Sequence, residues 1–181
     1  MEVERLEREY DVRVRFAPFL LDPTVPPEGK ERRRYTVPDS PQTPIEERGE
    51  RLGIRFTRGR ERTSYSMPAL QAAEFASDHG EGHAFHKEMF KAYFEDLADI
   101  SQTETILDAA KAAALDPDAM RRSLDTGEYA ERVNEGIAWS RAVGVSGIPT
   151  FIFEGKYGLV GAQEYDVFQS FMARLGKEPK A

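Results

Sequence analysis

The spacing of apolar residues changes from helical to extended at Gly144, and this change constrains the fold more than any other feature of the sequence. Before it, from about residue 43, the apolar residues recur at helical spacing. After it, the stretches "TFIF" (150–153) and "YGLVG" (157–161), with Gly155 between them, predict an antiparallel hairpin. The closing stretch "EYDVFQSFMARLG" (164–176) returns to helical spacing and predicts a last helix that ends at Gly176. A chain of this kind belongs to the α/β class.

The residues before position 43 predict one short helix, one strand and a long loop. Residues 2–9 place Val3 and Leu6 on one helix face, with Tyr10 just beyond. Residues 11–19 alternate apolar side chains with arginines, which predicts a strand with one buried face. Residues 22–42 are rich in proline and charge, and we expect a loop there.

Capping signals divide the helical block. Thr43 with Glu46, and Pro44 between them, form a capping box for a helix to about Leu52. Ser101 with Glu104 predicts a second capping box, and Asp116-Pro117 predicts the start of another helix. Further helices are expected at 67–80, 83–97 and 129–143. One wide apolar stripe should face a core, and its members are Phe85, Met89, Phe90, Tyr93, Phe94 and Leu97.

The composition excludes several classes of protein. The chain has 181 residues, 31% of them charged, a net charge of −7 and no cysteine. Disulfides, thiolate metal sites and self-contained thiol chemistry are therefore excluded. No stretch resembles a membrane span, and "MEVERLEREY" lacks the apolar run of a secretory signal. We expect a cytoplasmic protein with no membrane partner.

Arginines concentrate between Lys30 and Arg62, a pattern that a nucleic-acid surface would also show. Glutamates are interleaved with these arginines, and no run of aromatic residues offers bases a stacking surface. We expect a solvated surface there and no nucleic-acid partner.

Two other groups of residues could carry chemistry. His83 and His86 could share a helix face and bind a metal with Glu81 or Glu88, but such histidines are more often surface residues, and we expect no metal site and no cofactor. Trp139, the only tryptophan, is interpreted as a packing residue.

Four segments spread along the chain resemble the DsbA-like thioredoxin family, in particular its FrnE-type disulfide oxidoreductases. They are "RFAPFLLDPTVPPEG" (15–29), "AFHKEMFKAYFEDLADI" (84–100), "LDPDAMRRSLDTGEYAERV" (115–133) and "GVSGIPTFIFEGKYGLVGAQ" (144–163). The resemblance implies a thioredoxin-like domain, N-terminally incomplete, at residues 1–42 and 144–181, with an inserted all-helical subdomain at residues 43–143.

The resemblance also assigns a substrate-binding loop, made of Ser146, Gly147, Ile148, Pro149 and Thr150. In the family this loop carries a cis-proline beside the redox cysteines. A proline has no N–H and a fixed φ, so the backbone of Ile148 would be left facing an extended substrate chain. The implied partner is an extended peptide or protein.

Family members begin with a central strand and a Cys-x-x-Cys pair, and this sequence begins inside the helix that follows them. We expect both to lie upstream of Met1, either because Met1 is an internal methionine or because a lineage lost the segment. If the chain folds as given, the strand at 11–19 should pair directly with the hairpin, or a second subunit should fill the gap.

Three functions stay open. The first is a FrnE-type thiol–disulfide oxidoreductase that is inactive in redox chemistry and has no catalytic residue, because the cysteines are absent. The second is the branch of 2-hydroxychromene-2-carboxylate isomerases and kappa-type glutathione transferases, whose partner would be glutathione. The third is a non-catalytic module that binds peptides or forms a homodimer through its sheet edge.

Overall fold

The computed structural model describes residues 2–32 and 40–180. The chain divides into two compact units, one made of Met1–Leu21 and Ala138–Ala181 and the other of Asp22–Ile137. Helix α7 (Ala130–Ala142) contributes residues to both units. The sequence predicts an inserted helical subdomain at residues 43–143, and the second compact unit is the one that contains this helical block. Among the described residues, no helix is long and apolar enough to cross a membrane.

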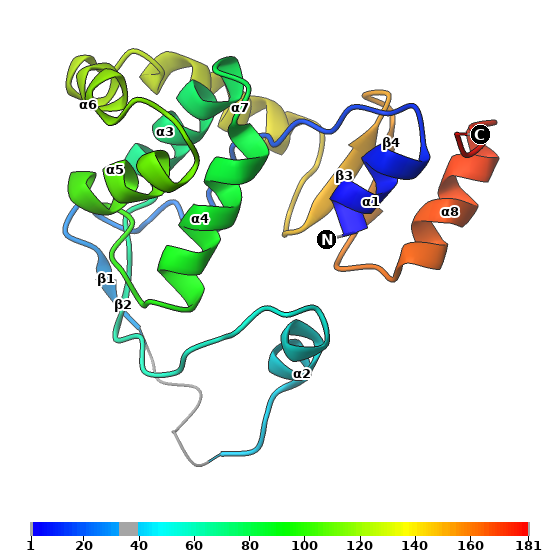
Figure 1. The fold of residues 1–181 in the computed structure, drawn as a ribbon, viewed down its shortest axis with the longest axis horizontal. Helices are drawn as coiled ribbons and strands as arrows, with labels where there is room; N and C mark the ends of the chain where they lie inside the picture. The colour runs from blue at the N-terminus through cyan, green and yellow to red at the C-terminus, as the bar shows by residue number, and fades with distance from the viewer. Residues whose placement is uncertain (1, 33–39, 181) are drawn as a thin grey trace. The chain divides into compact units, whose positions relative to one another are not determined.

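The unit of Asp22–Ile137 is a helical bundle with a two-stranded ribbon and a projecting arm (Figure 1). The described part of the arm is residues 40–61, which precede the second strand of the ribbon. Helix α3 (Met67–Asp78) packs against α4 (Gly82–Phe94), α5 (Thr103–Ala112) and α6 (Pro117–Thr126). Strands β1 (Lys30–Glu31) and β2 (Arg62–Thr63) pair antiparallel. The sequence had indicated only a loop where β1 lies. Residues 33–39 of that expected loop lie outside the described residues.

The core of the bundle is formed by the apolar side chains that its helices direct toward one another. Its fully buried members include Ala72, Ala76, Phe85, Ile106, Ala110 and Met120. The expected stripe on α4 is only partly confirmed. Phe85 and Met89 are buried, but Phe90 and Phe94 are exposed on another side of the helix, and Leu97 lies beyond its end with φ 55°.

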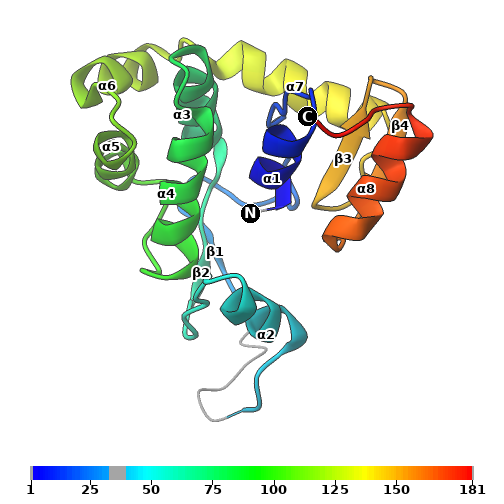
Figure 2. The same cartoon turned by 45° about the vertical axis from the view of Figure 1, so that its right-hand side comes forward.

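The arm carries helix α2 (Pro44–Arg51), which begins at the expected capping box (Figure 2). The Thr43 N–H donates to the Glu46 carboxylate at 2.7 Å, and the Glu46 N–H donates to the Thr43 hydroxyl at 3.4 Å. The capping box predicted at Ser101 is wrong. Helix α5 has Gln102 as its N-terminal cap, and the Ser101 hydroxyl instead donates to Asp99 at 2.8 Å.

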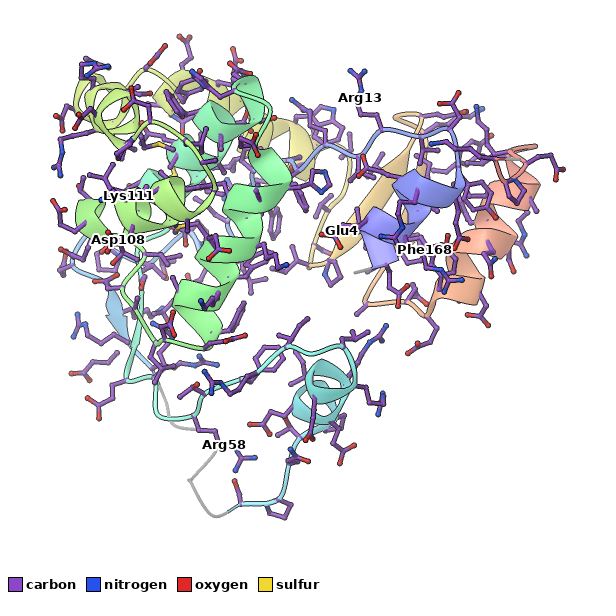
Figure 3. All side chains as sticks on the ribbon, viewed as in Figure 1. Glu4, Arg13, Arg58, Asp108, Lys111 and Phe168 are labelled. Carbon is purple, nitrogen blue, oxygen red and sulfur yellow. The ribbon has the colours of Figure 1, made fainter. Side chains whose placement is uncertain are left out.

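The other unit places two helices against one face of a hairpin (Figure 1). Helices α1 (Glu2–Glu9) and α8 (Tyr165–Arg174) bury their apolar sides against β3 (Thr150–Phe153) and β4 (Tyr157–Val160). Phe151 meets Phe168 edge to face, with ring centroids 4.8 Å apart. Figure 3 labels Phe168 on α8. The buried members of this cluster are Leu6, Tyr10, Tyr165, Phe168 and Met172.

The predicted strand at residues 11–19 is not formed. Half-buried and exposed residues alternate from Val12 to Phe16, so the sequence pattern survives. Within residues 2–32 and 40–180, however, this segment pairs with neither hairpin strand. The Val14 N–H donates to the Glu7 carboxylate at 2.7 Å instead of to a neighbouring strand. The expected direct pairing with the hairpin is therefore wrong, because an extended segment becomes a strand only beside a partner edge.

Candidate functional site

The end of α7 turns the chain into the loop of residues 144–149. Gly144 has φ 83°, a conformation that glycine adopts without a Cβ clash. Its N–H donates to the Arg141 carbonyl at 3.0 Å, and the Val145 N–H donates to the Ser140 carbonyl at 3.0 Å. These two bonds satisfy carbonyls at the helix end and fix the direction in which the loop leaves.

A buried hydroxyl anchors the base of this loop. The Ser140 hydroxyl donates to the Pro18 carbonyl at 3.0 Å, although the two residues are 122 positions apart. A buried carbonyl without such a donor would destabilise the fold by about 1–3 kcal/mol. Ser140 could not be singled out from the sequence, because a serine inside a helical pattern gives no signal of a distant partner.

The predicted residues 146–150 form one continuous segment, which bends at residues 147–149 and enters β3 at Thr150. Hydrogen bonds hold it on both sides of Ile148. The Ile148–Pro149 peptide bond is cis. The Thr150 hydroxyl donates to the Gly147 carbonyl at 2.7 Å. The Pro149 carbonyl accepts from the Gly161 N–H at 2.8 Å, which ties the loop to the end of β4.

Ile148 is the exposed residue of this turn. Its side chain is 60% exposed. Within the described part of the chain, its backbone N–H and C=O make no hydrogen bond. None of the residues 146–150 carries an ionisable side chain, so the loop has no group for acid–base chemistry. Its geometry suits binding, since a free N–H and C=O side by side can pair with an extended chain.

Three apolar residues of the same unit are exposed on α7 and β4, the elements on either side of the loop and its hairpin. Trp139 was interpreted as a packing residue, but it is 42% exposed. Val143, at the end of α7, and Val160, at the end of β4, are exposed as well. This exposure could not be predicted from the sequence, because helical and strand periods mark which residues are apolar and not which faces stay uncovered.

Two of the histidines of the helical unit, His79 and His86, make local hydrogen bonds. Nδ1 of His79 lies 2.8 Å from the Phe75 carbonyl, and Nδ1 of His86 lies 2.8 Å from the Gly82 carbonyl. Burial lowers the pKa of His86 below its usual 6.5. No group of three His, Asp or Glu side chains placed to hold a metal occurs in the residues that the structure covers.

Comparison with known proteins identifies the family. A family model described as the DSBA-like thioredoxin domain matches residues 1–173. The chain belongs to this family. The DsbA-like resemblance and the α/β thioredoxin-like fold with its helical insertion are thereby confirmed.

Two individual proteins resemble this DsbA-like chain. The uncharacterized protein YwbO of Bacillus subtilis (strain 168) is 26% identical over 162 residues, which cover 88% of this chain and 80% of YwbO. The crystal structure of a probable DsbA oxidoreductase from Streptomyces coelicolor matches with a TM-score of 0.67 at 21% identity. That match covers 73% of this chain and 58% of the Streptomyces chain, so this chain spans less than two thirds of its structural neighbour. At this identity the likeness shows the fold.

Proposed function

We propose that this DsbA-like chain is of the FrnE type, that it holds an extended peptide against residues 146–150, and that it exchanges no disulfide by itself. The observation that supports the binding step is the exposed turn at Ile148, whose backbone N–H and C=O make no hydrogen bond among the described residues. The absence of cysteine supports the lack of redox activity, because thiol–disulfide exchange requires an attacking thiolate.

The loop is suited to this role because the residues on either side of Ile148 are held by hydrogen bonds, while the backbone of Ile148 makes none among the described residues. Gly147 is held by Thr150, and Pro149 is held by Gly161. A preorganised loop loses little conformational entropy when a peptide pairs with it. The peptide backbone would exchange hydrogen bonds with Ile148, and the exposed side chains of Trp139 and Val143 offer apolar contact nearby in sequence.

Peptide binding can be tested with a fluorescein-labelled insulin B chain whose cysteines are alkylated, measured by fluorescence anisotropy. We expect saturable binding and, in nitrogen-15 NMR spectra, a shift of the Ile148 amide signal. Ile148→Pro removes the N–H donor, and Ile148→Ala keeps it as the matched control. Loss of one hydrogen bond worth about 1 kcal/mol should weaken binding by roughly fivefold in Ile148→Pro. Equal affinity of the proline variant and the wild type would contradict the proposal.

Redox inactivity is tested separately by insulin reduction with dithiothreitol as the reductant. We expect the rate of insulin precipitation to equal the uncatalysed rate at every protein concentration. A rate that rises with protein concentration would show that the cysteine-free chain has an activity of its own. Because this assay does not depend on peptide affinity, the two parts of the proposal can fail independently.

A further inference from the structure

A cavity of about 240 Å³ lies beside the two-stranded ribbon of the helical unit, labelled β1 and β2 in Figure 1. Its walls are residues 28–29 before β1, residues 59–64, which include β2, and Leu97 and Asp99, which follow α4. All of them belong to the unit Asp22–Ile137, whereas the loop of residues 146–150 belongs to the other unit. Pockets for drug-sized molecules measure about 300–1,000 Å³, so a ligand of this smaller cavity should be about the size of an amino acid.

Arg60 brings a fixed positive charge to the wall of the cavity. Its guanidinium lies over the Tyr93 ring, 3.7 Å from the ring centroid, and donates to the carbonyls of Tyr93 and Ala98. Among the described residues it forms no ion pair. Burial lowers the pKa of Arg60 below its ordinary value, as it does for a cation that is partly removed from water. An arginine nevertheless stays protonated, so this charge is permanent.

Arg62 supplies a second guanidinium that is held in the same manner. Its Nη2 donates to the carbonyls of Glu28 at 2.9 Å and Gly29 at 3.1 Å. Within residues 2–32 and 40–180, it too forms no ion pair. Bonds to carbonyls fix the direction of both guanidinium groups and leave some of their N–H groups for other acceptors.

The acidic residues of the wall limit the charge that a ligand can carry. Asp99 is already bonded, since its carboxylate accepts from the Ser101 N–H at 3.0 Å, the Ser101 hydroxyl at 2.8 Å and the Gln102 side chain at 3.2 Å. Glu28 and Glu61 are exposed. Among the described residues of the wall, three carboxylates stand beside two guanidinium groups. Repulsion by the carboxylates grows with the charge of an anion, so a monoanion is a better ligand than a dianion.

Leu97 adds an apolar side chain to the wall at a backbone position where glycine is usual. Its φ is 55°, in the left-handed region, just beyond the end of α4. The Ala98 N–H donates to the Ala92 carbonyl at 2.8 Å and closes the helix end around Leu97. Leucine is strained in this conformation and glycine is not. A strained residue in a cavity wall indicates a role for its side chain in contact with a ligand.

We propose that this cavity binds a small monocarboxylate with a branched apolar group, whose carboxylate pairs with Arg60 and whose apolar group contacts Leu97. The planar fork of a guanidinium matches the two oxygens of a carboxylate. Arg62 lies in the same wall and offers further N–H donors to the ligand. Because the ligand is small, we expect a dissociation constant of about 1–10 mM.

Isovalerate, titrated into the nitrogen-15-labelled full chain and followed by NMR, tests the proposal. We expect saturable shifts of the Arg60 Nε–H signal and of the Gly59 and Thr63 amide signals. Isovaleramide has nearly the same shape without the charge, and it should bind more than about tenfold more weakly because it loses the charge-assisted hydrogen bonds. Inorganic phosphate should also bind more weakly than isovalerate. Sodium chloride at equal ionic strength is the control for a general salt effect.

The proposal is overturned if isovalerate causes no saturable shift of these signals at about 50 mM. It is also overturned if isovaleramide or phosphate binds as tightly as isovalerate, because the site would then not select a monocarboxylate.

Three variants test the assigned contacts. Leu97→Gly relieves the backbone strain, so it should fold like the wild type by circular dichroism and bind isovalerate about three- to tenfold more weakly. Arg60→Met should weaken binding more than about tenfold. Arg51→Met is the matched charge control, because Arg51 is exposed on α2 and outside the cavity wall, and it should keep the affinity of the wild type.

Wild-type affinity in Leu97→Gly or in Arg60→Met would overturn the proposal. Equal losses in Arg60→Met and Arg51→Met would overturn it as well, because only the overall charge of the unit would then matter. If Arg60→Met does not fold, the shift of the Arg60 Nε–H signal in the wild type decides, since it reports the contact with the carboxylate directly.

Discussion

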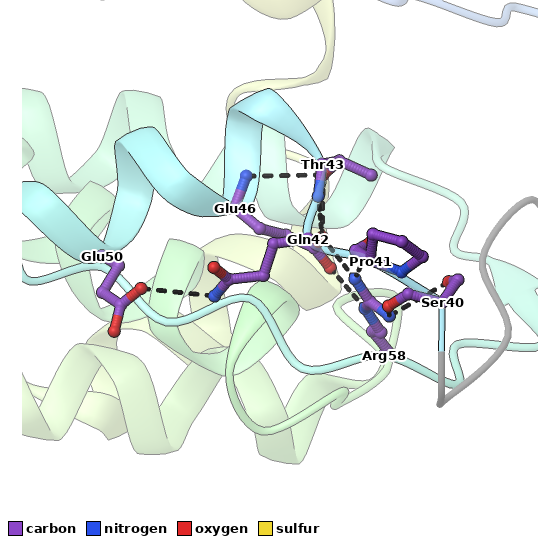
Figure 4. Close-up of polar contacts among 7 residues, drawn as sticks. All are labelled: Ser40, Pro41, Gln42, Thr43, Glu46, Glu50 and Arg58. Carbon is purple, nitrogen blue, oxygen red and sulfur yellow. Dashed lines mark hydrogen bonds and ion pairs between the residues drawn. The ribbon is translucent and has the colours of Figure 1, made fainter.

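Arg58 links the two ends of the arm of the helical unit, because its side chain bonds residues near the start of the arm. Its guanidinium binds both carboxylate oxygens of Glu46 at 2.7 Å, and it donates to the Ser40 carbonyl at 2.6 Å and the Pro41 carbonyl at 2.9 Å (Figure 4). Both charged side chains are mostly buried. A bidentate pair of this geometry fixes the direction of both groups, which a lysine could not do. The Glu46 carboxylate thus serves two structures: it accepts from Thr43 in the capping box of α2, and it accepts from Arg58 at the other end of the arm.

The titration of Glu46 is a direct test of this cluster. The hydrogen bonds from Arg58, followed by those from Thr43, lower the pKa of Glu46 from 4.5 to about 2. Because the folded-state pKa is depressed, the carboxylate stabilises the arm fully above pH 4.5 and loses this effect as the pH falls through about 2. A carbon-13 NMR titration of the Glu46 carboxyl group should place its midpoint near the lower value.

Arg58→Met should return the Glu46 midpoint toward its ordinary value. Arg55→Met is the matched control, since Arg55 pairs with Glu95, 3.7 Å away, and should leave the midpoint unchanged. A wild-type midpoint near 4.5 would mean that the Arg58 pair does not persist in solution.

Helix α4 carries two phenylalanines in opposite environments, so it allows the effect of burial to be measured on one type of side chain. Phe85 is 0% exposed in the bundle core, whereas Phe90 is 48% exposed. Phe85→Ala should lower the free energy of unfolding by about 3–5 kcal/mol, since it removes buried surface and leaves a cavity. Phe90→Ala should change it by less than about 1 kcal/mol. Urea unfolding monitored by circular dichroism measures both, and equal losses would show that Phe90 is buried in solution.

Elements with local signals could be predicted from the sequence, and elements with distant partners could not. The capping box at Thr43, the hairpin around Gly155 and the stop at Gly176 depend on neighbouring residues, and all three are confirmed. The strand at 11–19 failed because its alternation says nothing about a partner edge. The three-residue spacing of Ser101 and Glu104 likewise could not show that the Ser101 hydroxyl would donate to Asp99.

The candidate site also has one part that local sequence predicts and another that depends on distant contacts. The turn of residues 146–150 could be located because its residues are contiguous and carry the family pattern. The contact of Ser140 with Pro18, across 122 positions, and the exposure of Trp139 depend on tertiary packing that no local period encodes.

At the scale of the whole molecule, the two compact units have separate apolar clusters. The cluster around Phe85 draws its buried residues from the helices of the unit Asp22–Ile137. The cluster around Phe168 draws its buried residues from α1, α8 and the adjoining Tyr10 in the other unit. Among residues 2–32 and 40–180, no buried residue belongs to both clusters. A cavity made in one unit should therefore act first on the amides of that unit.

Native-state hydrogen exchange of Phe168→Ala tests this separation. Phe168 is almost fully buried and contacts Phe151 of β3, so its truncation should lower the protection of amides in α1, α8 and the hairpin by about 3–5 kcal/mol. Amides of α3 to α6 should keep the protection of the wild type, and Phe85→Ala should produce the reverse pattern. If either variant lowers protection equally throughout the chain, the two units unfold as one cooperative body, because exchange then proceeds through global unfolding in both.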